Sequence, residues 1–213
     1  MGKGTNGPLG KMTGRTGNLV WRITKNGNVL ATKPHKSHVP ATEGQLKVRS
    51  KLSLMSSFVS RITGLINIGF KNYTSKMSAT NAAVSYNIKH AIKEEDTEFQ
   101  IDYPKFAFSR GPLFEPDEPK AVAEAGQKIV VSWAPEKEDT AYNSDTDQLT
   151  VLIYNLRTEE FCVAKNKAAR AEGVYTMNLP SPFEGDVVHC YINFTSEKGK
   201  VSDSVYLGKL LVI

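Results

Sequence analysis

Residues 127–133 have the sequence Gln-Lys-Ile-Val-Val-Ser-Trp, in which Ile129, Val131 and Trp133 occupy every second position. A second run, residues 149–154 (Leu-Thr-Val-Leu-Ile-Tyr), is apolar or β-branched throughout. Because successive side chains of a strand point to opposite faces, such runs predict strands that are buried on one or both faces. They decide the fold class of the second half of the chain, which we expect to be a β-sandwich.

Similar short runs continue to the end of the chain. Pro, Gly, Asn and Asp separate them at 111–119, 135–147 and 180–186, as turn residues do between strands. The predicted strands are residues 99–103, 105–109, 128–134, 148–155, 160–164, 173–178, 187–195 and 202–211. We therefore expect an all-β sandwich over residues 99–213.

The segment before the sandwich, residues 41–93, has the signals of helices. Thr42 followed three residues later by Gln45 predicts a capping box at a helix N-terminus. Apolar residues then recur in steps of four and three, which places them on one helix face. These residues are Val48, Leu52, Met55, Val59, Ile62 and Ile66. A second helix is expected over residues 78–92, with its alanines near one face.

Residues 1–40 form a glycine-rich arm and a β-hairpin in our interpretation. Seven of the first 27 residues are glycine, and the arm holds too few apolar residues to fold alone. Residues 19–24 and 29–32 read as strands, and Asn26-Gly27 between them is typical of a type I′ turn. The whole chain is thus predicted to be α+β, with this arm and hairpin, a helical segment, and then the sandwich.

The charge of the chain is split between its two halves. Residues 1–93 hold 15 Lys and Arg against a single acid, a net charge of +14, whereas residues 94–213 hold 12 against 21, a net charge of −9. The boundary lies in the acidic run 94–98. This asymmetry indicates an anionic partner for the first half: nucleic acid, a membrane surface, or the acidic half of another copy.

The basic residues around Trp21 are the candidate binding residues. Cations can contact phosphates and the indole ring can stack on a base, so the set is typical of a nucleic-acid or acidic-protein contact surface. The alternative is that these residues merely solubilise the first half. The candidates are Lys3, Lys11, Arg15, Trp21, Arg22, Lys25, Lys33, Lys36, Lys47, Arg49, Lys51 and Arg61.

The sandwich runs resemble a known fold family. Residues 127–133, residues 149–154, and Leu179-Pro180 ahead of residues 187–194 are similar to the B, C and E-to-F strands of a fibronectin type III-like, or immunoglobulin-like, domain. This resemblance covers roughly the last 90 residues. It implies a β-sandwich and no particular activity.

Over its whole length the chain resembles an uncharacterised family of Bacteroidota proteins, a domain of unknown function with such a sandwich at its C-terminal end. The residues that carry this likeness are 14–20, 68–73, 81–87 and 99–104. The glycine-rich and lysine-rich hairpin, the proline after it and the Thr-x-x-Gln helix start also resemble some phage-like proteins. Neither likeness implies a mechanism.

No motif for catalysis, metal or cofactor binding stands out. The glycines at 10, 14 and 17 lack the Lys-Ser/Thr pair of a P-loop, and no Gly-x-Ser-x-Gly elbow is present. Cys162 and Cys190 lie in apolar runs, typical of reduced core residues. Pairs such as His35 with His38, or Asp145 with Asp147, are typical of solvated loops. We therefore expect no enzymatic activity, no catalytic residues, no metal and no cofactor.

Three functions remain, in the following order. The first is a non-enzymatic structural or assembly protein whose basic arm docks on neighbouring subunits of an oligomer, filament or phage-like particle. The second is a nucleic-acid-binding protein that uses the basic half. The third is a surface glycan-binding or adhesive module. Neither a signal peptide nor an apolar stretch of membrane-spanning length is evident, so we expect a cytoplasmic or particle-associated protein.

Overall fold

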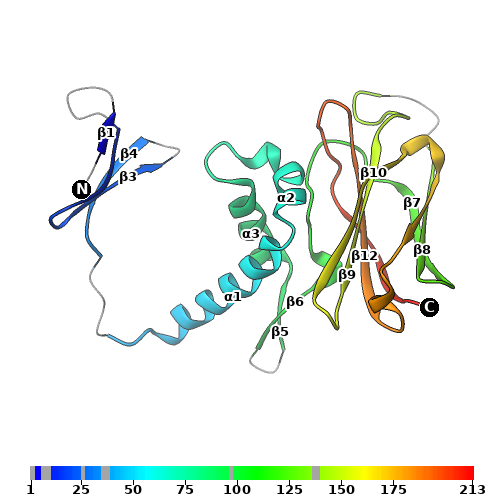
Figure 1. Cartoon of the computed structure of the whole chain (residues 1–213), viewed down its shortest axis with the longest axis horizontal. Coiled ribbons are helices and arrows are strands. Elements are labelled where there is room, and N and C mark those ends of the chain that lie inside the picture. Colours follow the sequence, from blue (N-terminus) through cyan, green and yellow to red (C-terminus); the bar gives the residue numbers. More distant parts are fainter. Residues whose placement is uncertain (1–2, 6–10, 25–26, 35–38, 96–97, 136–139) are drawn as a thin grey trace.

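The structure is a computed structural model of the chain, and it describes residues 3–5, 11–24, 27–34, 39–95, 98–135 and 140–213. Three parts follow one another along the longest axis of the molecule: a small sheet, a group of helices and a pair of larger sheets (Figure 1). Among the residues that the structure describes, the buried hydrophobic side chains all belong to the last two parts.

The first part is a four-stranded antiparallel sheet in which the strands lie in sequence order. Its strands are β1 (Lys3–Thr5), β2 (Lys11–Thr16), β3 (Leu19–Thr24) and β4 (Gly27–Thr32). The pairing of β3 with β4, from Leu19 opposite Thr32 to Thr24 opposite Gly27, confirms the predicted hairpin. The glycine-rich arm adds β1 and β2 to it, and Gly17 supplies the positive φ of +60° in the turn before β3.

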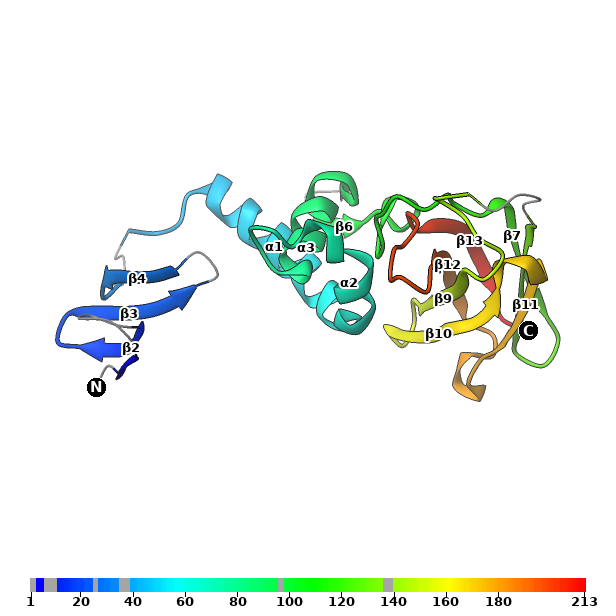
Figure 2. The ribbon, with the colours of Figure 1, turned by 90° about the horizontal axis from the view of Figure 1, so that it is seen from above.

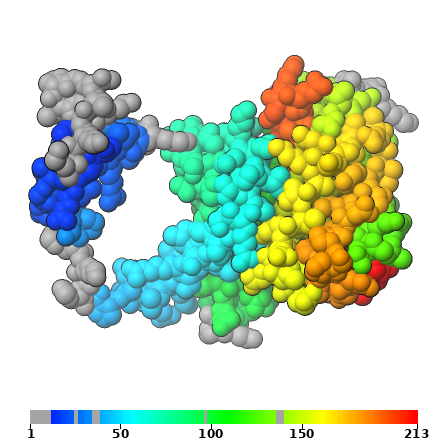
Figure 3. Space-filling model, viewed as in Figure 1, coloured from blue at the N-terminus to red at the C-terminus, as the bar shows by residue number. Residues whose placement is uncertain are grey.

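This N-terminal sheet, β1 to β4, stands apart from the rest of the molecule. Figure 3 shows open space between it and the helices, and the chain crosses to them after Lys33. None of the described side chains from Met12 to Thr32 is buried. The expectation that the arm lacks a core of its own is consistent with this exposure, although the arm does pair into strands.

The second part contains three α-helices. They are α1 (Glu43–Ser60), α2 (Thr63–Gly69) and α3 (Ala79–His90), with a short 3-10 turn, η1 (Lys71–Tyr73), after α2. The predicted capping box is confirmed. The backbone nitrogen of Gln45 donates to Thr42 Oγ1, and the backbone nitrogen of Thr42 donates to Gln45 Oε1. Ser78 caps α3 in a similar way through the Asn81 nitrogen.

The predicted apolar stripe of α1 is buried only in its second half. Met55 and Val59 are fully buried, whereas Val48 is 65% exposed and Leu52 48% exposed. The physical reason is that the first turns of α1 project beyond the helices that it packs against (Figure 2), so this half of the stripe is only partly covered. Phe58, outside the predicted stripe, is buried as well.

The third part is a sandwich of two antiparallel sheets. One has the strand order β11-β8-β7 and the other β10-β9-β12-β13. Their bounds are β7 (Asp117–Glu124), β8 (Lys128–Ala134), β9 (Gln148–Asn155), β10 (Glu160–Ala169), β11 (Val174–Asn178), β12 (Val187–Thr195) and β13 (Val205–Leu211). Side chains of both sheets share one hydrophobic core. The predicted β-sandwich and six of its strands are therefore present.

Two strand predictions need correction. Residues 105–109 are not a strand: Lys105 ends a 3-10 turn, η2 (Tyr103–Lys105), and Phe106 and Phe108 are buried in the irregular segment that follows. The strand β7 lies where turns were expected up to residue 119. It is an edge strand, and its exposed charged side chains hide the apolar alternation that identifies a half-buried strand.

The acidic run between the halves forms a hairpin. The strands β5 (Ile92–Glu95) and β6 (Glu98–Ile101) pair antiparallel, and β6 lies against α1. The first of these strands was not predicted, because Lys93, Glu94 and Glu95 are all exposed and give no periodicity. This hairpin belongs to the helical part rather than to the sandwich.

The helical part covers the outer face of the β10-β9-β12-β13 sheet, which gives three layers. Phe58 of α1 lies 4.9 Å from the ring of Tyr154 on β9, and Phe106 lies 5.9 Å from the ring of Tyr191 on β12. Alternate residues of β9 face the inner core and the helices. Both faces of β9 are therefore buried, which explains why residues 149–154 lack polar side chains other than a threonine and a tyrosine.

Candidate interaction surfaces

One face of the N-terminal sheet carries a row of apolar side chains without a charge. The register places Trp21 opposite Leu30 on β4 and opposite Gly14 on β2. Because side chains alternate, Leu19 and Ile23 share this face with Trp21 and Leu30. Leu19, Ile23 and Leu30 are 41%, 48% and 47% exposed, and Trp21 is half-buried. We call these four residues the apolar row.

The opposite face of the same sheet is basic. Arg15 lies opposite Val20, and Arg22 opposite Val29, so both arginines lie on the face away from the apolar row. The sheet therefore separates Trp21 from Arg15 and Arg22, which are near it in the sequence. A base stacked on this indole would lie on the other side of the sheet from the arginines.

The predicted residues on α1 and at its C-cap, Arg61, form a second, separate basic group. Lys47 lies 3.5 Å from both Glu43 and Glu94, and these two carboxylates, Glu94 first, raise the pKa of its ammonium group. Lys51 lies over the ring of Phe99 at 4.6 Å. Arg61 donates to the Glu159 carboxylate at 2.9 Å. Lys47, Lys51 and Arg61 therefore already interact with acidic or aromatic side chains of the same chain.

The remaining candidates belong to the N-terminal sheet and the connection after it. Lys33 is exposed, and its backbone nitrogen donates to Asn18 O at 2.8 Å. Arg49 is also exposed, on the projecting half of α1. Lys3 and Lys11 lie in β1 and β2. Lys25 and Lys36 lie outside the described residues, so the structure brings together only part of the predicted set.

A groove runs between α1 and α3, with a volume of about 670 Å³. Sequence reasoning did not identify it, because its two walls come from helices that are separated by the 18 residues 61–78. Its lining combines aliphatic side chains with small hydroxyl and amide side chains. The residues are Leu52, Ser56, Ser60, Thr80, Asn81, Val84, Ser85, Ile88 and Lys89. We call it the α1–α3 groove.

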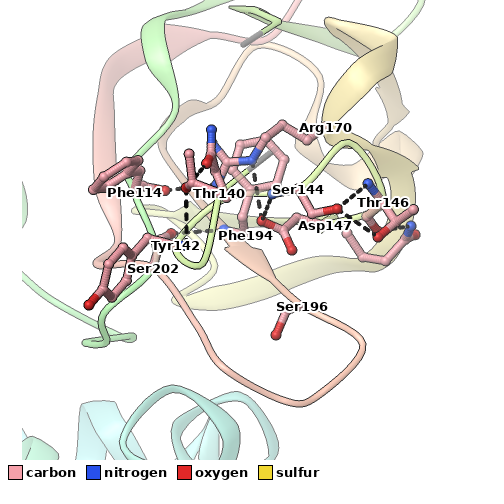
Figure 4. Close-up of polar contacts among 12 residues, drawn as sticks. Phe114, Thr140, Tyr142, Ser144, Thr146, Asp147, Arg170, Phe194, Ser196 and Ser202 are labelled. Atoms are coloured by element: carbon pink, nitrogen blue, oxygen red, sulfur yellow. Dashed lines mark hydrogen bonds and ion pairs between the residues drawn. The ribbon is translucent and has the colours of Figure 1, made fainter. Parts of the chain in front are cut away.

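A polar pocket of about 380 Å³ lies among the loops at one end of the sandwich. Beneath it Arg170 points toward Asp147 and the ring of Phe194 (Figure 4). The Arg170 Nη2 atom donates to Phe114 O at 2.8 Å. The backbone carbonyl of Arg170 accepts a hydrogen bond from Trp133 Nε1 at 2.7 Å. These contacts fasten the loops to the sandwich, and they show that Asp147, expected in a solvated turn, is buried.

The described residues give no sign of a metal centre or a membrane span. Among them, no group of three or more His, Cys, Asp or Glu side chains is placed to hold a metal ion. Within the same residues, no helix is both long and apolar enough to cross a membrane. Cys162 and Cys190 are free thiols, and burial raises the pKa of Cys190 to about 12.

Comparison with protein families gives a match over residues 11–208 to a family of unknown function, DUF6266. The chain belongs to the DUF6266 family. The match begins within the N-terminal sheet and extends into β13, so the family includes all three parts of the structure. No curated protein matches this DUF6266 chain.

Fibronectin type III domains are among the solved structures similar to the DUF6266 chain. The FN5 domain of Drosophila Lar is 14% identical, with a TM-score of 0.33, over 46% of this chain and 92% of that domain. The fn3 domain of human collagen alpha-1(XX) is 11% identical, with a TM-score of 0.35, over 47% of this chain and 88% of that one. The sandwich itself is defined by the sheet order and shared core described above.

Proposed function

We propose that this DUF6266 protein is a non-enzymatic assembly protein whose N-terminal sheet packs on a neighbouring copy, in an oligomer or a filament. The observation that supports the proposal is the apolar row on a sheet that has no second layer. A sheet with one apolar face is stable when another layer covers that face. Within the described chain, Leu19, Ile23 and Leu30 of this row remain 41%, 48% and 47% exposed.

The charge pattern of the sheet supports the same function. Residues 1–40 contain seven Lys and Arg and no acid, yet the apolar row contains none of these charges. An uncharged face within so basic a segment is typical of a surface that becomes buried. The row contains Trp and three large aliphatic residues, the kinds of side chain that contribute most when an interface excludes water.

The test is the mass of the full-length protein in solution, measured by size-exclusion chromatography with light scattering at low salt. We expect the wild type to form species larger than the 23.5 kDa monomer. The double variant Leu19→Lys/Leu30→Lys should remain monomeric, because it charges the apolar row. Its matched control, Val20→Lys/Val29→Lys, adds the same charge to the opposite, basic face and should assemble. A wild type that is monomeric at every concentration would refute the proposal.

Nucleic-acid binding is the second candidate, and the basic face with Arg15 and Arg22 favours it. Cations aligned on one sheet face can follow a phosphate backbone, and the affinity would then fall steeply with salt. Fluorescence anisotropy with labelled DNA and RNA at 50 mM salt tests it. Arg15→Ala/Arg22→Ala should weaken the binding at least tenfold, whereas Leu19→Lys/Leu30→Lys should not. Absence of binding at 50 mM salt would exclude this function.

A further inference from the structure

The loops at one end of the sandwich carry an exposed pair of aromatic rings. Phe114 is 50% exposed and Tyr142 is 49% exposed, and the centres of their rings lie 5.8 Å apart (Figure 4). No other aromatic side chain among the described residues from 99 to 213 is as exposed. Aromatic side chains are enriched in the buried centre of protein–protein interfaces, where a ring contributes a large apolar area. We call Phe114 and Tyr142 the aromatic pair.

The backbone under the aromatic pair is held by several hydrogen bonds. The Phe114 nitrogen donates to Tyr142 O at 2.8 Å, and Phe114 O accepts from the guanidinium of the buried Arg170 at 2.8 Å. Leu113, the residue before, is buried, and its nitrogen donates to Val201 O at 3.1 Å. Rings on a backbone that is already ordered lose less conformational freedom when a partner covers them, so the aromatic pair is preorganised for binding.

The surroundings of the aromatic pair are acidic. The described residues of the two segments that carry the rings, 111–119 and 140–147, contain five acids and no Lys or Arg. Asp147 is buried beside Arg170, and the other four acids, Glu115, Asp117, Glu118 and Asp145, are exposed. The neighbouring turn 196–200 has one acid and two lysines, of which Lys200 lies 6.0 Å from the Tyr142 ring. The four exposed carboxylates outnumber its single net positive charge.

We propose that the N-terminal sheet of a second copy of this chain docks on the aromatic pair, with the apolar row against the two rings. The inference rests on the proposed function and names the surface that receives the sheet. The contact buries large apolar side chains of both partners, the aromatic pair on one copy and the apolar row with Trp21 on the other. Each of these surfaces is exposed within its own chain.

The charges favour the sandwich loops as the partner of the sheet. Residues 1–40 hold seven Lys and Arg and no acid, and residues 41–93 hold eight against one acid, whereas residues 94–213 have a net charge of −9. A basic sheet is therefore repelled by another sheet and by the helices of another copy, and it is attracted by the acidic loops.

The arginines of the sheet contribute to this attraction from its other face. Arg15 and Arg22 lie on the face away from the apolar row. Charges interact over about 10 Å at 0.1 M salt, and roughly 10 Å is also the spacing of two packed sheets. Cations on the outer face of a single sheet layer are therefore close enough to attract carboxylates that surround the aromatic pair of the partner.

This contact joins two different surfaces of the same chain. Each copy then offers its N-terminal sheet to one neighbour and its aromatic pair to another. Such a head-to-tail contact builds rings if its rotation closes and filaments if it does not.

The test uses two variants of the full-length protein, each of which removes one side of the contact. The sheet variant is Leu19→Lys/Leu30→Lys. The loop variant is Phe114→Lys/Tyr142→Lys, which replaces both rings by cations that repel the basic sheet. Both rings are half exposed and the hydrogen bonds of Phe114 with Tyr142 and Arg170 use its backbone atoms, so the loop variant should fold.

A matched control, Val122→Lys/Leu211→Lys, adds the same charge to the sandwich outside these loops. Val122 lies on β7 and Leu211 on β13, and the two side chains are 58% and 55% exposed. Light scattering gives the mass of each variant and of their mixtures, and circular dichroism checks that each is folded. The control should assemble like the wild type.

We expect the sheet variant and the loop variant each to be monomeric. An equimolar mixture of the two should form a one-to-one dimer, because the intact sheet of the loop variant binds the intact aromatic pair of the sheet variant. A loop variant that assembles like the wild type overturns this inference and leaves the proposed function standing. A mixture that stays monomeric also overturns it. A monomeric wild type removes both.

The salt dependence of wild-type assembly separates this contact from one between two N-terminal sheets. Attraction between a basic sheet and acidic loops is screened by salt, so the association constant should fall at least threefold between 50 mM and 300 mM sodium chloride. Two sheets of equal positive charge would instead associate more strongly as salt screens their repulsion. An association constant that stays the same or rises over this range overturns the inference.

Discussion

The guanidinium of Arg170 lies 3.4 Å from the carboxylate of Asp147, and both side chains are only 2% exposed. The same guanidinium lies 4.1 Å from the centre of the Phe194 ring. An ion pair buried between the strands of a sandwich is costly to desolvate, so each partner depends on the other. This pair connects the start of β9 to the end of β10, through segments that are 23 residues apart in the sequence.

We expect Arg170→Met to lower the free energy of unfolding by about 3–5 kcal/mol, because it leaves the Asp147 charge buried without the guanidinium. The double variant Arg170→Met/Asp147→Leu should recover part of this loss, since the uncompensated charge is then absent. Urea denaturation followed by circular dichroism measures both. If Arg170→Met changes stability by less than 1 kcal/mol, the pair does not hold the loops as described.

Substitution of two glycines of α2 by alanine should change the stability of the protein in opposite directions. A Cβ on Gly69 would lie 2.2 Å from Phe108 O and 2.7 Å from Ser109 Cα, both backbone atoms that cannot move aside. Gly69→Ala should therefore destabilise the protein by about 1–3 kcal/mol or more. Gly64 has open space at the same atom, so Gly64→Ala should stabilise it by about 0.5–1 kcal/mol. Thermal unfolding of the two variants should place their midpoints on opposite sides of the wild type.

Much of the architecture could be predicted from local sequence, and the reason lies in particular residues. The capping box at Thr42 and the hairpin at residues 19–32 are short-range signals, and both are confirmed. The helical cover on β9 depends instead on contacts such as Phe58 with Tyr154, which are 96 residues apart. No local pattern distinguishes a strand buried by one sheet from one buried by a sheet and helices.

The candidate surfaces were predictable only in part. The charge count located a basic N-terminal segment, but alternation along β3 decides that Trp21 and Arg22 face opposite ways. That consequence requires the strand and its register. The α1–α3 groove depends on how two helices pack, which the sequence does not state. The burial of Asp147 could not be predicted either, because its partner Arg170 lies in a different connection between strands.

Asn87 should be among the most sensitive polar residues of the helical part. It is fully buried, and its side chain donates to Ala107 O at 2.8 Å and accepts from the Ala107 nitrogen at 2.9 Å. Asn87→Leu leaves both backbone groups unpaired, which costs about 1–3 kcal/mol for each buried group. Hydrogen exchange should show faster exchange of the Ala107 amide. Unchanged protection there would contradict this role.

Stability should decrease between about pH 6.5 and pH 4 because of His189. Burial, with a smaller effect of Lys209, lowers the pKa of this imidazole to about 4 from the ordinary 6.5. The folded protein then binds fewer protons than the unfolded chain in this window, so stability is complete above pH 6.5 and falls toward pH 4. The ring also stacks on Tyr103 at 4.1 Å and bonds to Tyr206 Oη at 2.7 Å.

The measurement for His189 is the urea midpoint of the wild type and of His189→Gln at pH 7.5 and at pH 5. Glutamine keeps a polar side chain near Tyr206 and does not titrate. The wild type should lose more stability than the variant on acidification. Equal losses would assign the pH dependence to other groups, of which Asp186 acts at lower pH because Arg157 and Asn155 lower its pKa.

The fluorescence emission of Trp21 should change when the protein assembles. The chain has two tryptophans, and Trp133 is buried in the sandwich core at 4% exposure. In a Trp133→Phe background, the emission comes from Trp21 alone. Burial of the apolar row excludes water from this indole, so its emission should shift to the blue as the protein concentration rises. The added substitutions Leu19→Lys/Leu30→Lys, which charge the apolar row, should abolish the shift. A concentration-independent spectrum from a sample that light scattering shows to be assembled would mean that assembly uses another surface.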